Sequence, residues 1–281
     1  MRKQRERSLG NRVLLGLNAA QLDGCECHGA IVSTDRVLQA SGAILRWPHS
    51  ALESAPETGF IMPLVPDNPN NRSIASILLR ERGVIAYPTD TVYGLGAIVF
   101  NRSAVSTVFV IKGRQRDQAL PVLVASESQL REVAADVSDE AMALAKRFWP
   151  GALTLVMKRH PQLPLNVTGG GDTVAVRLPD HPCPQSLISA CGSPITGTSA
   201  NKHGGPNPTT AAEVQRQLGS RLSLILDGGP SPLGVPSTVV DVTATLPRVL
   251  RQGAISIEEL RTVCPVAEPD PVPTPPETRG S

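Results

Sequence analysis

Residues 74–96 read IASILLRERGVIAYPTDTVYGLG, and this stretch determines the fold class that the sequence predicts. Apolar residues recur at helical spacing up to Gly83, which is expected to cap the C-terminus of a helix, and residues 84–87 are typical of a short buried strand. A proline ends that strand, and a turn rich in threonine and glycine follows. A helix that leads directly into a buried strand indicates a layered α/β domain.

The same alternation of helix and strand continues along the chain. A helical stripe of apolar residues ends near Lys112, and residues 120–124 are expected to form a strand whose proline marks a sheet edge or a strand start. The spacing of Ser126 with Gln129, and of Thr210 with Glu213, predicts helices that begin near residues 127 and 211. Further strands are expected at 153–157, 173–177, 222–226, 238–242 and 249–250. We therefore expect a three-layer α/β domain (mixed α+β) whose sheet combines parallel and antiparallel pairs.

The two ends of the chain differ from this central part. Residues 1–69 show no sustained hydrophobic period and are predicted to be a poorly structured extension, which leaves 70–262 as the folded domain. Residues 263–281 are rich in proline and are predicted to be disordered. The basic N-terminus permits a weak organelle-targeting interpretation, and Met62 permits the alternative that translation starts there.

Composition excludes several classes of protein. A net charge of +2 gives no global attraction for nucleic acid, so an anionic ligand has to be bound by a local cluster of cations. Five cysteines, an odd number without framework spacing, argue against a secreted disulfide scaffold and favour the cytoplasm. No apolar run is long enough to span a membrane, and we expect no membrane partner and no metal site in the protein itself.

Two features suggest anion binding. The loop 112–117 reads KGRQRD and gathers three cations, a composition that suits phosphates, although a solvated helix end is an equally good interpretation. The chain contains no Walker motif, so ATP would have to bind without a P-loop. Arg177, at the end of a predicted buried strand, needs an anion, either a ligand carboxylate or a structural Asp or Glu.

Hydroxyl and amide side chains are concentrated in turns, above all in TGTSAN at 196–201. No Ser-His-Asp order, carboxylate pair or histidine-rich metal site accompanies them. Such a set suits a site that binds, orients and neutralises charge, as phosphoryl or nucleotidyl transfer requires.

Seven short strings, taken in their order, resemble the YrdC family of threonylcarbamoyl-AMP synthases over residues 70 to 260. They are PTDTVYG at 88–94, KGR at 112–114, PGALT at 150–154, VAVR at 174–177, SAN at 199–201, STVVD at 237–241 and RQGAI at 251–255. The resemblance implies a three-layer YrdC/RibB-like fold with a twisted mixed sheet and a concave ligand cavity. It also implies a nucleotidyltransferase that joins L-threonine, bicarbonate and ATP into threonylcarbamoyl-AMP and diphosphate.

The resemblance also implies a role for individual residues. Catalysis would fall to Lys112 and Arg114. Threonine would be bound by Thr91, Arg177, Thr198 and Ser237, and ATP by Lys112, Arg114, Gln118, Thr173, Ser199, Asn201, Asn207 and Arg251. Mg²⁺ would enter with ATP, coordinated largely by phosphate oxygens. The product would pass to a threonylcarbamoyl-transferase machinery that modifies ANN-decoding tRNA.

Alternative functions remain at this point. A non-catalytic YrdC-like RNA-binding protein is the first, although aromatic residues for base stacking make up only 3% of the chain. The second is the related domain of a hydrogenase-maturation protein, which normally carries zinc-finger pairs that this chain lacks.

Overall fold

The computed structural model describes residues 64–269 and four short strands before them. The chain divides into two compact units, Met1–Gly59 and Phe60–Ser281. In the first unit the strands β1 (Val13–Leu15), β2 (Ala30–Val32), β3 (Leu38–Ala40) and β4 (Ala43–Leu45) pair in order as an antiparallel sheet. The region predicted to be poorly structured therefore contains strand pairing in its described part, and its other residues before 64 lie outside the described ones.

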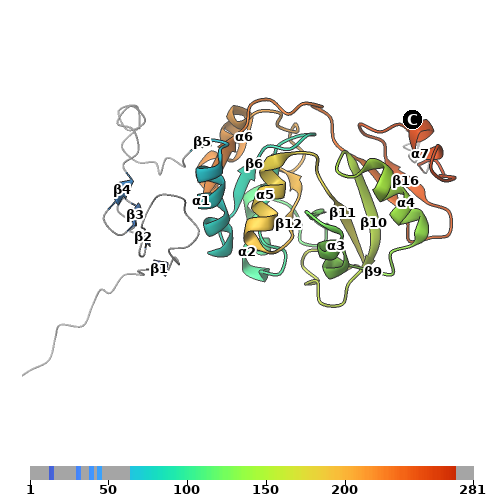
Figure 1. Ribbon diagram of the computed structural model, residues 1–281, viewed down its shortest axis with the longest axis horizontal. Helices are drawn as coiled ribbons and strands as arrows, with labels where there is room; N and C mark the ends of the chain where they lie inside the picture. The colour runs from blue at the N-terminus through green and yellow to red at the C-terminus, as the bar shows by residue number, and fades with distance from the viewer. Residues whose placement is uncertain (1–12, 16–29, 33–37, 41–42, 46–63, 270–281) are drawn as a thin grey trace, which may run out of the picture. The chain divides into compact units, whose positions relative to one another are not determined.

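The second unit contains two mixed sheets, where the sequence led us to expect one. The five-stranded sheet has the order β13 (Thr198–Ser199), β7 (Gly94–Gly96), β6 (Ile85–Tyr87), β14 (Leu224–Asp227) and β5 (Leu64–Pro66). The path of the seven-stranded sheet is β12 (Ile195–Thr196), β8 (Val122–Leu123), β11 (Thr173–Arg177), β10 (Leu153–Arg159), β15 (Thr238–Asp241) and β16 (Arg248–Arg251), and β9 (Ala134–Ala135) pairs with β10. In Figure 1, β5 and β6 lie in the left part of this unit and β10, β11 and β16 in its right part.

Helices cover both faces of the five-stranded sheet. On one face, Ile85 and Tyr87 of β6 share a core with Leu79 of α1 (Pro69–Arg80) and Leu187 of α5 (Pro182–Cys191). On the other face, Ala86 belongs to a larger core that includes residues of α2 (Arg102–Lys112) and α6 (Ala211–Leu218). The alternation of side chains along a strand thus separates the two cores and produces three layers around this sheet. The remaining helices are α3 (Glu127–Val133), α4 (Asp139–Phe148) and α7 (Ile257–Arg261), with a 3₁₀ turn, η3 (Gly219–Arg221).

The predicted helix starts at residues 127 and 211 are confirmed. The hydroxyls of Ser126 and Thr210 accept hydrogen bonds from the third residue of their helices, at 3.3 Å in both cases. The returning side chain binds one residue earlier than in a capping box, because Glu213 accepts from the backbone of Thr209 at 2.6 Å. The full reciprocal box occurs instead at Ser256, in the unpredicted helix α7.

One local prediction is corrected, and one open alternative is settled. Helix α1 is capped by Glu81, and the left-handed backbone falls on Arg82 at φ 68° rather than on Gly83. Strand β8 is not at an edge, because it lies between β12 and β11, and its proline marks the strand start.

The domain boundaries also move outward from residues 70 and 262. Strand β5 adds to the five-stranded sheet next to β14, and Ala267 bridges to Arg248 of β16. Both segments are short and carry no periodic signal, so only their pairing reveals them. The proline-rich residues 270–281 lie outside the described residues. Among the helices that the structure describes, none combines the length and apolar character that a membrane crossing requires.

Candidate active site

Residues of both sheets line a cavity of about 250 Å³. Its walls are formed by the turn after β6, the loop before β8, strand β13 and one face of the seven-stranded sheet. Most of the residues predicted to bind ligand line it, namely Thr91, Arg114, Arg177, Thr198, Ser199, Asn207, Ser237 and Arg251. These segments are far apart in sequence, and the fold brings them to one place.

One row of side chains across the seven-stranded sheet contributes the cavity's lining on that side. Strand register places Leu123 beside Arg177, and Thr154 beside Val239, which in turn pairs with Arg251. Strands β10 and β11 pair in antiparallel register, with Leu155 opposite Val176, and this register continues to place Thr154 beside Arg177. Because Arg177 and Arg251 stand three strand spacings apart, their backbones are separated by about 14 Å. The two arginines therefore reach the cavity from the strands that flank β10 and β15.

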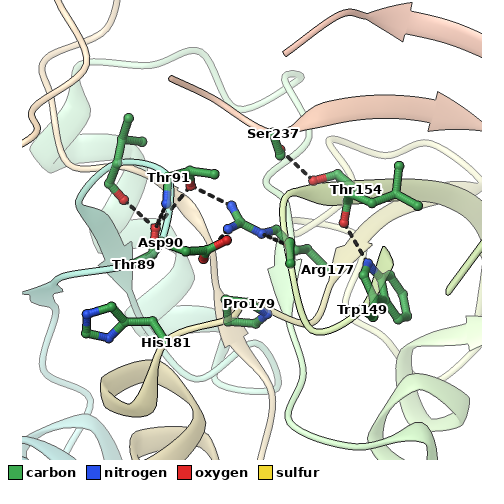
Figure 2. A network of polar contacts seen from close by, with 12 residues as sticks. Thr89, Asp90, Thr91, Trp149, Thr154, Arg177, Pro179, His181 and Ser237 are labelled. Atoms are coloured by element: carbon green, nitrogen blue, oxygen red, sulfur yellow. Dashed lines mark hydrogen bonds and ion pairs between the residues drawn. The ribbon is translucent and has the colours of Figure 1, made fainter. Parts of the chain in front are cut away.

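Arg177 is bound on three sides by the protein (Figure 2). Its Nη1 donates to the hydroxyl of Thr91 at 2.6 Å, its Nε to the carbonyl of Gly151 at 2.8 Å, and its Nη2 forms an ion pair with Asp90. Burial lowers the pKa of Arg177, and the neighbouring carboxylate of Asp90 opposes that shift. Of the two anions considered from sequence, the structural one is thus present, and one N–H on each terminal nitrogen remains for a ligand.

Hydroxyl groups surround this arginine at fixed positions. Thr89 donates to the carbonyl of Val92 at 2.7 Å and lies 3.1 Å from the hydroxyl of Thr91. On the strand next to that of Arg177, the hydroxyl of Thr154 lies 2.8 Å from that of Ser237 (Figure 2). Because these side chains bind one another, their oxygens are already oriented before a ligand arrives.

Among the described residues, Arg114 and Arg251 are the other two cationic side chains that line the cavity. Arg114 donates from Nη2 to the carbonyl of Ala119 at 2.8 Å, and its buried Nε has no partner among the described residues. Arg251 is more exposed and donates to the carbonyl of Ser237 at 2.9 Å. Burial lowers the pKa of Arg114. No Asp or Glu of the described chain lines the cavity, so these charges are available to an anion.

Lys112 does not line the cavity. Its ammonium is buried and donates to the carbonyl of Ser199, to the carbonyl of Asn201 and to the side chain of Asn201, the last two at 2.9 Å. Burial, and secondly the charge of Arg114, lower its pKa to about 7. In this structure Lys112 therefore supports the segment that presents Ser199, rather than reaching into the cavity as the sequence led us to expect.

Three other predicted ligands also lie outside the lining. Asn201 is buried and supports the same segment, accepting from the hydroxyl of Ser199 at 2.7 Å. Gln118 is half-buried beside the cavity, with its side-chain oxygen unpaired among the described residues. Thr173 is exposed at the opposite end of β11 from Arg177, about 13 Å along the strand.

Sequence reasoning did not single out Asp90 and Thr154, which the structure places at the candidate site. A signal for Asp90 was present, because a buried arginine needs an anion and Asp90 is the acidic residue of the turn 88–94. Thr154 carries no such signal, since only the strand register places it in the row between Arg177 and Val239.

Comparison with known proteins places these features in a family. Residues 77–253 match the Sua5/YciO/YrdC family model, whose description is "Telomere recombination". A threonylcarbamoyl-AMP synthase of Bacillus subtilis is 46% identical over 190 residues, which cover 67% of this chain and 55% of that protein. The chain thus spans about half the length of that relative.

Solved structures agree with the fold. The crystal structure of Pyrococcus abyssi Sua5 complexed with L-threonine has a TM-score of 0.70 and 40% identity, covering 74% of this chain and 62% of that one. The crystal structure of Escherichia coli YciO has a TM-score of 0.64 and 28% identity, covering 72% of this chain and all of that one. The mixed α/β architecture with two mixed sheets is therefore the one that these proteins share.

Proposed function

Because this chain belongs to the Sua5/YciO/YrdC family, we propose that it is a threonylcarbamoyl-AMP synthase. The reaction joins L-threonine, bicarbonate and ATP, and releases diphosphate and water. The matched region covers only about half of the Bacillus subtilis relative. The activity of that whole protein therefore does not carry over by itself, and the proposal also needs support from the site of this chain.

The observation that carries the proposal is the row of side chains across the seven-stranded sheet. It holds Arg177 among oriented hydroxyls on β11 and Arg251 on β16, three strand spacings along the sheet, with Arg114 also lining the cavity. A reaction between an amino acid and a nucleotide needs one anchor for a carboxylate and another for phosphates, on one surface. This cavity offers both.

In the proposed mechanism, the free N–H groups of Arg177 and the hydroxyl of Ser237 bind threonine. Its amine captures carbon dioxide derived from bicarbonate, and the carbamate oxygen attacks the α-phosphorus of ATP and expels diphosphate. Arg114 and Arg251 neutralise charge on the phosphates, so that the protein acts by positioning and electrostatic stabilisation. Such a reaction requires no protein nucleophile.

We further propose that Mg²⁺ is part of the substrate. Among the described residues, no group of three or more His, Cys, Asp or Glu side chains is arranged to hold a metal ion. A magnesium ion entering with ATP is coordinated by phosphate oxygens and water. The adenylate product would then serve a transferase that modifies ANN-decoding tRNA in the cytoplasm.

The test is an assay with purified protein, ATP, Mg²⁺, bicarbonate and labelled threonine, each omitted in turn. We expect threonylcarbamoyl-AMP and diphosphate only when all are present. Arg114→Ala is expected to lower kcat/KM for ATP tenfold or more, whereas Arg116→Ala is the matched control, since Arg116 is exposed in the same loop and does not line the cavity. RNA or ATP binding without product would favour the non-catalytic alternative.

A further inference from the structure

The three consecutive glycines at 169–171 belong to a hydrogen-bonded turn. The backbone of Gly170 donates to the carbonyl of Leu165 at 2.9 Å, and that of Gly171 to the carbonyl of Thr168 at 3.1 Å. The hydroxyl of the buried Thr168 returns a bond of 2.8 Å to the carbonyl of Gly171. The turn thus holds its own shape through several internal hydrogen bonds.

Gly169 lies directly against the loop that carries Arg114. A Cβ atom at position 169 would lie 2.2 Å from the carbonyl oxygen of Asp117 and 3.1 Å from the backbone nitrogen of Ala119. The backbone of Gly169 also has φ +62°, a left-handed conformation. Its neighbour Gly170 has φ +87°, but a Cβ there would meet nothing within 4 Å. Only the first of these glycines is in close contact with another segment.

This contact connects to the cavity through Arg114. The guanidinium of Arg114 donates to the carbonyl of Ala119, at the end of the segment against which Gly169 packs. The next residue, Leu120, donates to the carbonyl of Val167 in the turn itself at 2.8 Å. The position of the turn therefore fixes the position of the acceptor that orients Arg114.

We propose that Gly169 is a positioning residue for ATP, acting through the 117–119 segment on Arg114. The inference rests on the proposed function, in which Arg114 binds phosphate. Ordinary contact with a Cβ begins near 3.4 Å, so an alanine at position 169 would push the Asp117 carbonyl away by about 1 Å. A displacement of that size in a positioning group can lower a rate by about 100-fold.

The experiment compares Gly169→Ala with Gly170→Ala, which introduces a methyl group on left-handed backbone without the close contact. ATP binding is measured by calorimetry with a non-hydrolysable ATP analogue and Mg²⁺, and threonine binding separately without nucleotide. Steady-state kinetics give KM and kcat for each substrate, and thermal unfolding reports stability. We expect Gly169→Ala to weaken analogue binding tenfold to 100-fold and threonine binding less than twofold, while Gly170→Ala changes neither by more than twofold.

Equal effects of the two variants on the analogue, or an equal loss of threonine and analogue binding in Gly169→Ala, would overturn the proposal. If Gly169→Ala does not fold, Thr168→Val carries the test, because it loosens the turn without adding a methyl group at the contact. We expect it to weaken analogue binding at least threefold and to spare threonine binding, and unchanged analogue binding would count against the proposal. Since binding is measured directly, a wild-type protein that forms no product would refute the proposed function alone.

Discussion

Replacement of Asp90 by asparagine removes the buried ion pair between Asp90 and Arg177 and so measures its contribution to stability. Asp90 and Arg177 have side chains only 9% and 8% exposed, and asparagine keeps the shape while removing the negative charge. Loss of one partner from a buried pair costs about 3–5 kcal/mol, because the remaining charge stays desolvated. Arg177 retains its bonds to Thr91 and Gly151, so we expect the lower end, about 3 kcal/mol. That is a large part of the roughly 5–15 kcal/mol that stabilises a domain.

The assay is urea unfolding of the wild type, of Asp90→Asn and of a control, Glu127→Gln. Glu127 pairs with Arg131 at 2.7 Å, but these side chains are 57% and 66% exposed, so the control should lose less than about 0.5 kcal/mol. Saturating L-threonine should restore part of the loss in Asp90→Asn, because its carboxylate supplies an anion to Arg177. Equal stability of Asp90→Asn and wild type would refute the reasoning, as would equal losses in the variant and the control.

Three further outcomes are expected. The pKa of Lys112, lowered to about 7, means that the unfolded chain binds more protons at this lysine above pH 7. Wild-type stability should therefore rise with pH from 7 to roughly 8.5, by up to about 1.4 kcal/mol per pH unit, before the buried thiols of Cys183 and Cys191, whose pKa values are raised, oppose the rise; Lys112→Met should flatten it in urea titrations at several pH values. Arg251→Ala should lower kcat/KM for ATP at least tenfold, about 1.4 kcal/mol, and change threonine binding less, as single-turnover assays can show. Removal of residues 1–59, a separate compact unit, should leave the product yield per folded molecule unchanged.

Much of the fold follows from local patterns in the sequence. The apolar stripe of α2 is buried as predicted, at Ala104, Val105, Val108 and Ile111, because a helix with one apolar face has to cover a core. Strand β11 spans the predicted residues 173–177. These elements could be predicted because the spacing of apolar side chains along the chain is enough to specify them.

The division into two sheets could not be predicted from the sequence. Strand β7 reads Gly-Leu-Gly and β13 contains only Thr198 and Ser199, so neither carries a period. The glycines of β7 pack against the ring of Tyr87, where a Cβ at Gly94 would lie 2.7 Å away. Such strands are specified by close approach between segments, which a single sequence does not display.

The candidate site shows the same limit at the level of single residues. Arg114, Ser199 and Arg251, which belong to different motif strings, line one cavity, because strand ends and turns meet there. The strings did not separate residues that line the cavity from those that support the lining. Lys112 and Asn201 share a motif with Arg114 and Ser199, yet their polar atoms bind each other within the protein. That distinction depends on the direction of each side chain.

In the proposed function, the distribution of charge in the cavity favours different substrates at different arginines. At Arg177 the carboxylate of Asp90 offsets the cation, so this position carries little net charge and would suit a zwitterionic amino acid. Arg114 and Arg251 have no carboxylate partner among the described residues, and these two side chains would therefore suit a polyanion such as ATP. If Asp90 were absent, Arg177 would also attract phosphate, and a nucleotide could occupy the amino-acid position. We therefore expect ATP to compete more strongly with threonine in Asp90→Asn. The inhibition constant of ATP against threonine should fall in this variant and stay at the wild-type value in Arg116→Ala.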